Sequence, residues 1–432
     1  MFGKSRLLIG SMNRKNIFKF IKENKALIAF FVAVLIIILR RPDAVMNAQF
    51  WAEDGTVWFS KAYNEGGLKS LLQPQNGYYQ TISKLVAWIS LAFPLKFAPF
   101  IFNSIAIIIK ALPVALVWSS RFSKIIPSDA GKLAISAAYL LLPTIAEVHS
   151  NITNAHWHLA VYAFMIIVSI SPKSFLGKLH DIFFVIIAGL SGPFSIILSP
   201  IVIIFWWFRR KFLSGFFYAI AFAILLCAGI QVLSVLLTSE GTRSQAPLGA
   251  SVGLFIGLIS GKLFGVLLFG AKYIDDIAES LMLSLPIFLI GMGIIIFALF
   301  RASLELKLFI IFSALLITAA FNSPMISNTS PQWPSMISKT AGSRYFFIPL
   351  VAWSASLIWF LSRIKNKKIK IALSLIVGLL VSNVFLTSFK ISRYKDKEFH
   401  NHVEIFSNLP SGSEYRIPIN PGKGWDVFLI KK

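Results

Sequence analysis

The sequence predicts an all-α integral membrane protein with about eleven transmembrane helices, and its composition and hydropathy support this fold class. Of the 432 residues, 56% are hydrophobic and 14% are charged, whereas a soluble domain carries about 25% charged residues. The apolar residues fall into runs close to the roughly 17 to 25 residues that a helix needs to cross a bilayer. These runs must be helical, because lipid offers no hydrogen-bond partners to backbone amides.

The basic residues orient these spans. The formal net charge is +24, and Lys and Arg gather in short clusters between apolar runs, which is the positive-inside pattern of loops that face anionic cytoplasmic lipid. This pattern makes membrane lipids the expected partners and argues against nucleic acid. Residues 1–25 form a basic leader, which places the amino terminus in the cytoplasm. Cys227 is the only cysteine, so an intrachain disulfide and a cysteine metal cluster are excluded.

The first span, 26–40, leads into a first extracytoplasmic loop over residues 41–96. The apolar stretch 79–93 within this loop is short, and we expect it to lie as a helix in the outer membrane interface. The adjacent acids Glu53 and Asp54 therefore lie outside the cytoplasm.

Ten further spans complete a polytopic domain over residues 26–388. They are expected at 97–119, 132–147, 156–171, 180–192, 194–208, 214–237, 281–300, 306–321, 345–361 and 369–388. With this assignment, five separate basic clusters all fall on the cytoplasmic side. The Gly-rich stretch 252–270 is assigned to the outer interface. Ser191-Gly192-Pro193 interrupts one long apolar run, and we interpret it as a turn at a binding cavity.

Residues 389–432 differ in composition from the rest, with many charged residues followed by Pro and Gly. This tail is too short for an independent core, and we expect it to pack on the extracytoplasmic face of the bundle. The carboxyl terminus is then extracytoplasmic.

Glu53 and Asp54 lie among aromatic residues in the first loop. A carboxylate near a low-dielectric boundary has its pKa raised towards the working pH, which suits a general base. Adjacent side chains point in different directions, so at most one of the two is the base. The alternative is a solvated turn that caps the following helix.

The segment 147–158 supplies six candidate substrate-binding residues, which are His149, Asn151, Asn154, His156, Trp157 and His158. Imidazoles and amides hydrogen bond to sugar hydroxyls or to a pyrophosphate-like group, and an indole stacks on a sugar face. The spacing of the histidines does not match a zinc motif. The alternative is an aromatic and amide belt at the membrane interface.

Arg344 and Tyr345 begin an apolar span on the outer side, against the positive-inside bias. This pair suits a lipid phosphate, which arginine holds with a planar fork. The alternative is an arginine that anchors the end of the helix. Arg243 is a weaker candidate for the same role, and Asp275-Asp276 is interpreted as an exposed loop pair.

No glycine-rich nucleotide loop stands in a cytoplasmic segment, so an activated donor must arrive within the membrane. Four motifs then carry a resemblance to a known family: Phe50-Trp51-Ala52-Glu53-Asp54-Gly55, Asn154-Ala155-His156-Trp157, Ser191-Gly192-Pro193-Phe194 and Arg344-Tyr345-Phe346. With the predicted topology, they resemble the glycosyltransferase C superfamily, and in particular bacterial transferases that use polyprenyl-phosphate sugars and decorate O-antigen in the inner membrane.

The resemblance implies an inverting transfer of a sugar from a polyprenyl-phosphate donor to a glycan or lipid-linked acceptor on the extracytoplasmic face. It also implies an acid of the first loop as base and an arginine at the donor phosphate. Our hypothesis assigns the base to Asp54, a supporting role to Glu53 and the phosphate contact to Arg344. The order Glu-Asp departs from the Asp-Glu of other branches, which leaves the choice of base open. The sequence identifies no cofactor with certainty, and a divalent cation is an open alternative.

Two other classes of protein fit a chain with this many spans. A lipid-linked-sugar flippase or a solute transporter would place charged residues along a path within the spans. An O-antigen polymerase or ligase would show a large late extracytoplasmic loop with paired arginines, whereas the loop around Pro331 is modest.

Overall fold

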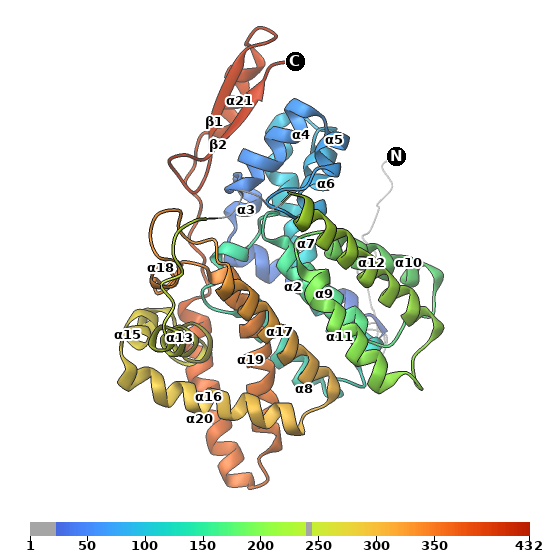
Figure 1. Cartoon of the computed structure of the whole chain (residues 1–432), viewed down its shortest axis with the longest axis vertical. Coiled ribbons are helices and arrows are strands. Elements are labelled where there is room, and N and C mark those ends of the chain that lie inside the picture. The colour runs from blue at the N-terminus through green and yellow to red at the C-terminus, as the bar shows by residue number, and fades with distance from the viewer. Residues whose placement is uncertain (1–22, 239–243) are drawn as a thin grey trace, which may run out of the picture.

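The computed structural model describes residues 23–238 and 244–432, which are mostly helical (Figure 1). Within these described residues, seven helical segments are long and apolar enough to cross a membrane. They are Leu95–Trp118, which contains η2 (Leu95–Phe97) and α7 (Ala98–Trp118), α12 (Gly215–Thr238), Val252–Phe269, α16 (Leu281–Arg301), α17 (Leu304–Asn322), α19 (Ser343–Arg363) and α20 (Lys367–Thr387). The chain is therefore a helical protein with membrane-spanning segments.

Five other expected spans form shorter helices of 13 to 16 residues. They are α2 (Lys25–Arg40), α8 (Asp129–Leu141), α9 (Ala155–Val168), α10 (Phe175–Gly189) and α11 (Phe194–Arg209). At about 1.5 Å per residue they are shorter than the roughly 30 Å hydrocarbon core. By length alone the described residues contain seven candidate spans. The expected total of eleven requires all five shorter helices to cross the membrane and the Val252–Phe269 run not to cross it.

The stretch Val252–Phe269 is one helical run, made of α13 (Val252–Ile259), a π-helical segment η5 (Ser260–Gly265) and α14 (Val266–Phe269). Figure 1 shows α13 almost end-on, whereas α20 runs along the length of the view. Gly257 lets this run approach α15 (Ile274–Glu279) closely, because a Cβ there would lie 2.1 Å from the Ala278 carbonyl oxygen. The run is long enough to cross a membrane, although we expected it at the interface.

The predicted break between two helices at Ser191-Gly192-Pro193 is confirmed. α10 ends at Gly189, α11 begins at Phe194, and Gly192 has a positive φ of +86°. The Gln231 side chain, from α12, donates hydrogen bonds to the carbonyls of Gly189 and Gly192 at 3.3 and 3.0 Å. This amide satisfies backbone groups that the break would otherwise leave unpaired inside the bundle.

Short helices make up most of the first loop, and others connect the longer helices. Those of the loop are α3 (Asp43–Met46), η1 (Asp54–Phe59), α4 (Ser60–Glu65), α5 (Gly67–Leu72) and α6 (Thr81–Ser90). The connecting ones are η3 (Ser120–Phe122), η4 (Ala146–Val148), η6 (Ala271–Tyr273) and α18 (Gln332–Ser335). The stretch expected as an interfacial helix is therefore helical, as α6.

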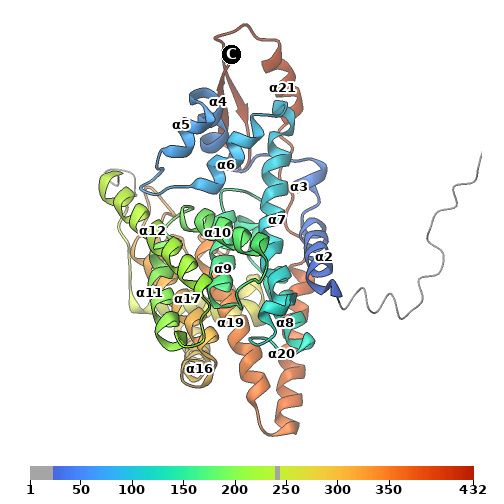
Figure 2. The ribbon, with the colours of Figure 1, turned by 90° about the vertical axis from the view of Figure 1, so that its right-hand side faces the viewer.

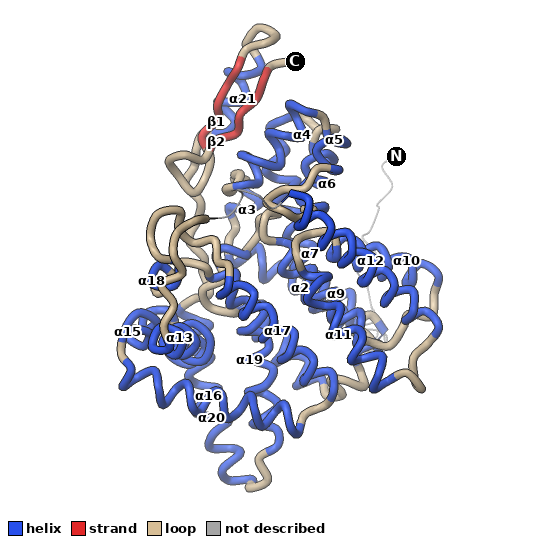
Figure 3. The backbone as a smooth tube through the Cα atoms, in the orientation of Figure 1, coloured by secondary structure: helices blue, strands red, loops and turns tan. Residues whose placement is uncertain are grey.

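The tail contains the named strands of the described chain (Figure 3). α21 (Phe399–Ser407) precedes an antiparallel hairpin of β1 (Glu414–Pro418) and β2 (Asp426–Ile430). The hairpin packs on the first loop, at the end of the molecule opposite the α19–α20 connection (Figure 2). The expectation of an all-α chain missed this small sheet.

Contacts between the tail and the first loop are both polar and apolar. The Ala52 amide donates to the Asn420 carbonyl at 2.7 Å, and the Phe428 amide donates to Ser60 Oγ at 3.0 Å. The rings of Phe50 and Phe399 meet edge to face, with their centroids 5.4 Å apart. The tail therefore forms one wall behind the turn that carries the acid pair.

Candidate functional site

Asp54 is held in place by a segment that follows it by about 100 residues in the chain. Its Oδ1 accepts hydrogen bonds from the Thr153 amide and hydroxyl, both at 2.7 Å, and its Oδ2 accepts one from the Ile152 amide at 3.2 Å. The side chain is fully buried. Burial raises the pKa of Asp54 to about 7, while these hydrogen bonds pull the pKa in the opposite direction. Three donors therefore surround this carboxyl group, which suits it to holding the turn together.

Glu53 is only partly buried, and it differs from Asp54 in its surroundings. No other residue in the described part of the chain donates a hydrogen bond to its carboxylate, whereas Asp54 receives three. Loss of hydration raises the pKa of Glu53; the charge of Arg344 lowers it and that of Glu147 raises it. A partly exposed carboxylate with a raised pKa and no fixed donor is suited to accept a proton from a ligand. Of the two acids, Glu53 is the better candidate for a base.

Arg344 lies at the amino-terminal end of α19 and is paired with Glu147 of η4. The Glu147 carboxylate accepts a hydrogen bond from the Arg344 guanidinium. It also accepts hydrogen bonds from the Arg344 amide and the Ser343 hydroxyl, each at 3.0 Å. The acid therefore caps the start of α19 as well as pairing with the guanidinium. Arg344 Nη2 also donates to the Met325 carbonyl at 2.7 Å and to the Tyr345 hydroxyl at 3.0 Å.

These contacts fix the guanidinium without enclosing it, since 25% of the Arg344 side chain stays exposed. Tyr345 is more buried, and its hydroxyl accepts the Met325 amide at 3.0 Å, so it also holds the loop before α19. The predicted pair therefore forms part of a polar site in which Glu53, Glu147 and Arg344 interact electrostatically. We did not anticipate Glu147 as the partner of Arg344.

His156 and Trp157 lie next to the Ser191-Gly192-Pro193 break. The Phe194 ring contacts both side chains, with centroid separations of 5.5 Å to His156 and 5.0 Å to Trp157. Trp157 also meets the Tyr345 ring edge to face at 6.1 Å. The buried Nδ1 of His156 and Nε1 of Trp157 have no hydrogen-bond partner among the described residues. These two residues keep polar atoms available near Arg344, as a substrate site requires.

The other predicted substrate-binding residues have structural roles instead. His158 is buried, with Nδ1 2.7 Å from the Tyr139 hydroxyl and Nε2 2.8 Å from the Val148 carbonyl oxygen. Both ring nitrogens are therefore used within the core, and the assignment of His158 to substrate binding is wrong.

His149 is likewise buried, with Nδ1 2.8 Å from Lys110 Nζ and Nε2 3.1 Å from the Ile37 carbonyl oxygen. Asn151 and Asn154 each donate to the Glu147 carbonyl at 2.8 Å. These contacts shape the 147–154 loop, so His149 and the two asparagines position the site rather than face a ligand.

Tyr394 of the tail completes the wall behind Asp54. Its ring stacks on Trp51 with centroids 4.8 Å apart, and the Arg41 guanidinium carbon lies 4.2 Å from the centroid of the same ring. Burial raises the pKa of Tyr394 to about 12. Nothing local in the sequence links residue 394 to residue 51, so this contact required the structure.

An apolar cavity of 480 Å³ lies between the Val252–Phe269 run, α16, α17 and α19. Phe255, Phe264, Trp333 and Trp353 contribute aromatic walls. Pro349, which also lines it, is five residues after Arg344, or about 7.5 Å along the helix. One wall of the cavity therefore comes from the helix whose first turn carries Arg344.

The remaining predicted residues do not join the site. Arg243 lies outside the described residues. Asp275 and Asp276 are exposed, as expected, but they lie in the first turn of α15 rather than in a loop. Across residues 23–238 and 244–432, no group of three or more His, Cys, Asp or Glu side chains is placed to hold a metal ion.

No protein-family model matches the chain, and no curated protein matches it. Arguments about function therefore rest on the geometry of the site and on the motifs that the sequence carries.

Proposed function

We propose that this protein is an inverting glycosyltransferase that takes a sugar from a polyprenyl-phosphate donor and passes it to a glycan or lipid-linked acceptor. The observation that carries the proposal is the placement of a free carboxylate, Glu53, within electrostatic reach of a fixed but partly exposed Arg344. A base and a phosphate-binding cation are the two groups that this transfer needs.

Each residue has a defined role in the reaction. Glu53 takes the proton of an acceptor hydroxyl, and the acceptor oxygen attacks the anomeric carbon of the donor sugar. The bond from that carbon to the phosphate oxygen breaks, and Arg344 stabilises the charge on the departing polyprenyl phosphate. Asp54 positions the turn through its hydrogen bonds with Ile152 and Thr153. We therefore propose Glu53 as the base in place of Asp54.

The apolar cavity that α19 lines in part supports the lipid character of the donor. Its walls come from the apolar faces of segments long enough to cross a membrane. A polyprenyl chain in this cavity places its phosphate near the amino-terminal end of α19. Trp157 and His156 then lie where a sugar ring attached to that phosphate would sit.

The proposal includes a topology in the bacterial inner membrane. With eleven spans, the amino terminus is cytoplasmic, and the first loop and the tail face the extracytoplasmic side. The basic connections between helices, such as residues 363–370 between α19 and α20, then face the cytoplasm. The packing of the tail on the first loop supports their placement on a common side.

One observation favours a transporter or flippase as the alternative. Lys110 is fully buried within α7, and Nδ1 of His149 lies 2.8 Å from its Nζ. Ionisable residues within spans are typical of transport paths. No feature of the described residues favours a polymerase or ligase over a transferase.

An assay with a radiolabelled polyprenyl-phosphate sugar separates these functions. Purified protein in detergent is given the labelled donor and a glycolipid extract as acceptor, and vesicles containing the protein are tested for movement of the same donor. Formation of labelled acceptor by the wild type, and its loss in the Arg344→Ala variant, would support the transferase. Translocation in vesicles without any transfer would refute it.

A further inference from the structure

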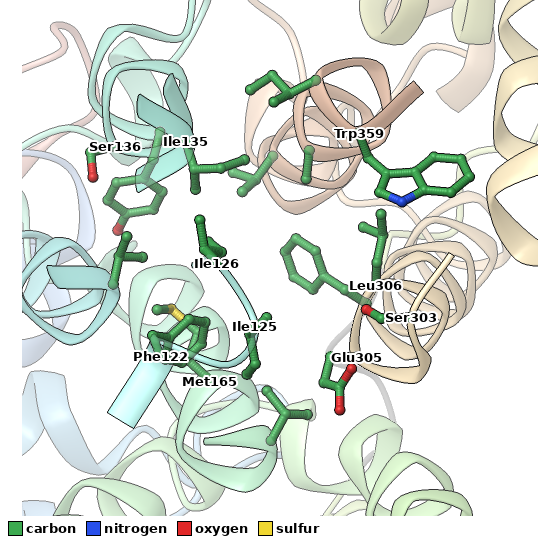
Figure 4. Close-up of a pocket in the computed structure, with 18 of the residues that line it drawn as sticks. Phe122, Ile125, Ile126, Ile135, Ser136, Met165, Ser303, Glu305, Leu306 and Trp359 are labelled. Atoms are coloured by element: carbon green, nitrogen blue, oxygen red, sulfur yellow. The ribbon is translucent and has the colours of Figure 1, made fainter. Parts of the chain in front are cut away.

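We propose that a second cavity, at the opposite end of α19, binds one acyl chain of an anionic phospholipid. This inference is independent of the proposed transfer reaction. The cavity has a volume of 360 Å³ and lies between α7, α8, α9, α17 and α19. Figure 4 shows the side chains of Phe122, Ile126, Met165, Leu306 and Trp359 around this space.

Three of the serine hydroxyls that line the cavity already have partners. The Ser128 hydroxyl accepts the Gly131 amide at 3.1 Å, and the Ser136 hydroxyl accepts Trp118 Nε1 at 3.1 Å. The Ser362 hydroxyl instead donates a hydrogen bond to the Trp359 carbonyl at 2.6 Å. With these groups engaged, the walls favour an apolar guest over a polar one.

The length of the cavity matches one leaflet of a bilayer. Along α19 its lining runs from Val351 to Arg363, which is about 18 Å at 1.5 Å per residue. Half of a hydrocarbon core of roughly 30 Å is about 15 Å. An acyl chain that enters at Arg363 therefore reaches the inner end of the cavity near the middle of the membrane.

The charge at the mouth selects an anionic head group. The acids near the mouth are already neutralised, since Glu305 pairs with Arg209 at 2.6 Å and Asp129 pairs with Lys25 at 2.5 Å. Within the described ranges, Arg363 forms no ion pair, and its guanidinium carbon lies 5.6 Å from the ring centroid of Trp359. Its exposed charge is free to meet a lipid phosphate.

This occupant is distinct from the proposed sugar donor. Arg344 and Arg363 stand at opposite ends of α19, 19 residues or about 28 Å apart along the helix. A phospholipid at Arg363 therefore lies in the other leaflet from a donor bound at Arg344. Its chain separates α8 from α17 and fills space that would otherwise be empty.

Native mass spectrometry of the purified, delipidated full-length protein tests this site. The protein is titrated in mixed micelles with dioleoyl phosphatidylglycerol or with dioleoyl phosphatidylcholine, and retained lipids are counted. We expect the wild type to retain one phosphatidylglycerol in preference to phosphatidylcholine. Ala355→Trp, which fills the cavity from α19, should lower that retention at least tenfold. Ala372→Trp, at an exposed position of α20, is the matched control and should bind as the wild type does.

Arg363→Gln tests the head-group contact. It should remove the preference for phosphatidylglycerol while retaining phosphatidylcholine binding, whereas Arg393→Gln, an exposed arginine of the tail, should leave the preference intact. If Ala355→Trp fails to give monodisperse protein, Ile135→Trp fills the same cavity from α8. Equal retention of both lipids by the wild type, or undiminished retention by a folded cavity-filling variant, would overturn the proposal.

Discussion

At the scale of single residues, Glu53 and Asp54 have the same chemistry and different surroundings. Asp54 accepts hydrogen bonds from Ile152 and Thr153, while the carboxylate of Glu53 accepts none from another described residue and its pKa is lowered by the charge of Arg344. A buried group with all its acceptors used holds a structure, and a partly exposed one with acceptors to spare exchanges protons. For the proposed transfer, this contrast favours Glu53 over Asp54 as the base.

The pH dependence of transfer follows from the pKa of Glu53. Burial raises this pKa above its ordinary value of 4.5, and only the ionised carboxylate accepts a proton. The rate should therefore be low at acid pH and rise as the pH passes the raised pKa. A pH–rate profile of kcat/KM on purified protein measures this. A rate that is already constant from pH 4.5 upward would contradict the role of Glu53.

Replacing Asp54 by Asn should weaken the fold. The introduced amide turns an N–H towards the Ile152 or Thr153 donors, so a buried hydrogen bond is lost, at a cost of about 1–3 kcal/mol. Thermal unfolding in detergent measures the loss. Asp276→Asn, at an exposed position in α15, is the control and should unfold as the wild type does. Equal stability of both variants would show that Asp54 does not hold the turn.

Sequence reasoning reached the residues of the site but not all of their roles. It found Glu53, Asp54, Arg344, His156 and Trp157, because acids and aromatics beside an apolar run stand out. It also predicted that His149 and His158 bind the substrate, although both are buried in the core. Their partners, residues 37, 110 and 139, are remote in the chain, and no local pattern reveals such pairings.

At the scale of elements, the tail and the first loop act as one unit. The turn at Gly55 packs directly on the β-hairpin, since a Cβ on Gly55 would lie 2.7 Å from Val427 Cγ2 and 2.8 Å from Ile419 Cδ1. The hairpin therefore supports the turn that presents Glu53. Its strands were missed because the alternating pattern is only five residues long in each.

Gly55→Ala should loosen this contact. The added methyl group overpacks the interface, which costs about 1–3 kcal/mol where neighbours cannot move, and the tail should become more accessible. Limited proteolysis measures cleavage between α20 and α21. Gly422→Ala, where a Cβ meets nothing within 4 Å, is the control and should be cleaved at the wild-type rate. Unchanged cleavage of Gly55→Ala would mean that the tail does not depend on this packing.

At the scale of the whole molecule, the two ends of the bundle differ in chemistry. One end gathers the first loop, the tail and the polar site, while the other carries the basic connection between α19 and α20 (Figure 2). Hydropathy and charge were enough to predict this division. They were not enough to count the spans. Several expected spans form helices that are too short to cross by length alone, whereas the Val252–Phe269 run, expected at the interface, is long enough to cross.

Cysteine labelling tests the predicted sidedness. Cys227 is the only cysteine, so Cys227→Ala gives a background for single cysteines at two exposed positions. Ser411→Cys in the tail should react with a membrane-impermeant maleimide added to intact spheroplasts. Asn366→Cys, between α19 and α20, should react only after the membrane is opened. Labelling of both from the same side would refute the topology.

The central claim, that Glu53 is the base of a sugar transfer, is tested most directly by the rate of Glu53→Gln in the purified transfer assay. The amide keeps the shape of the side chain and cannot accept the proton, so the rate should fall by about 10² to 10⁴. Glu65→Gln, an exposed acid of the same loop, is the matched control and should transfer at the wild-type rate. A folded Glu53→Gln variant that transfers sugar as fast as this control would contradict the account.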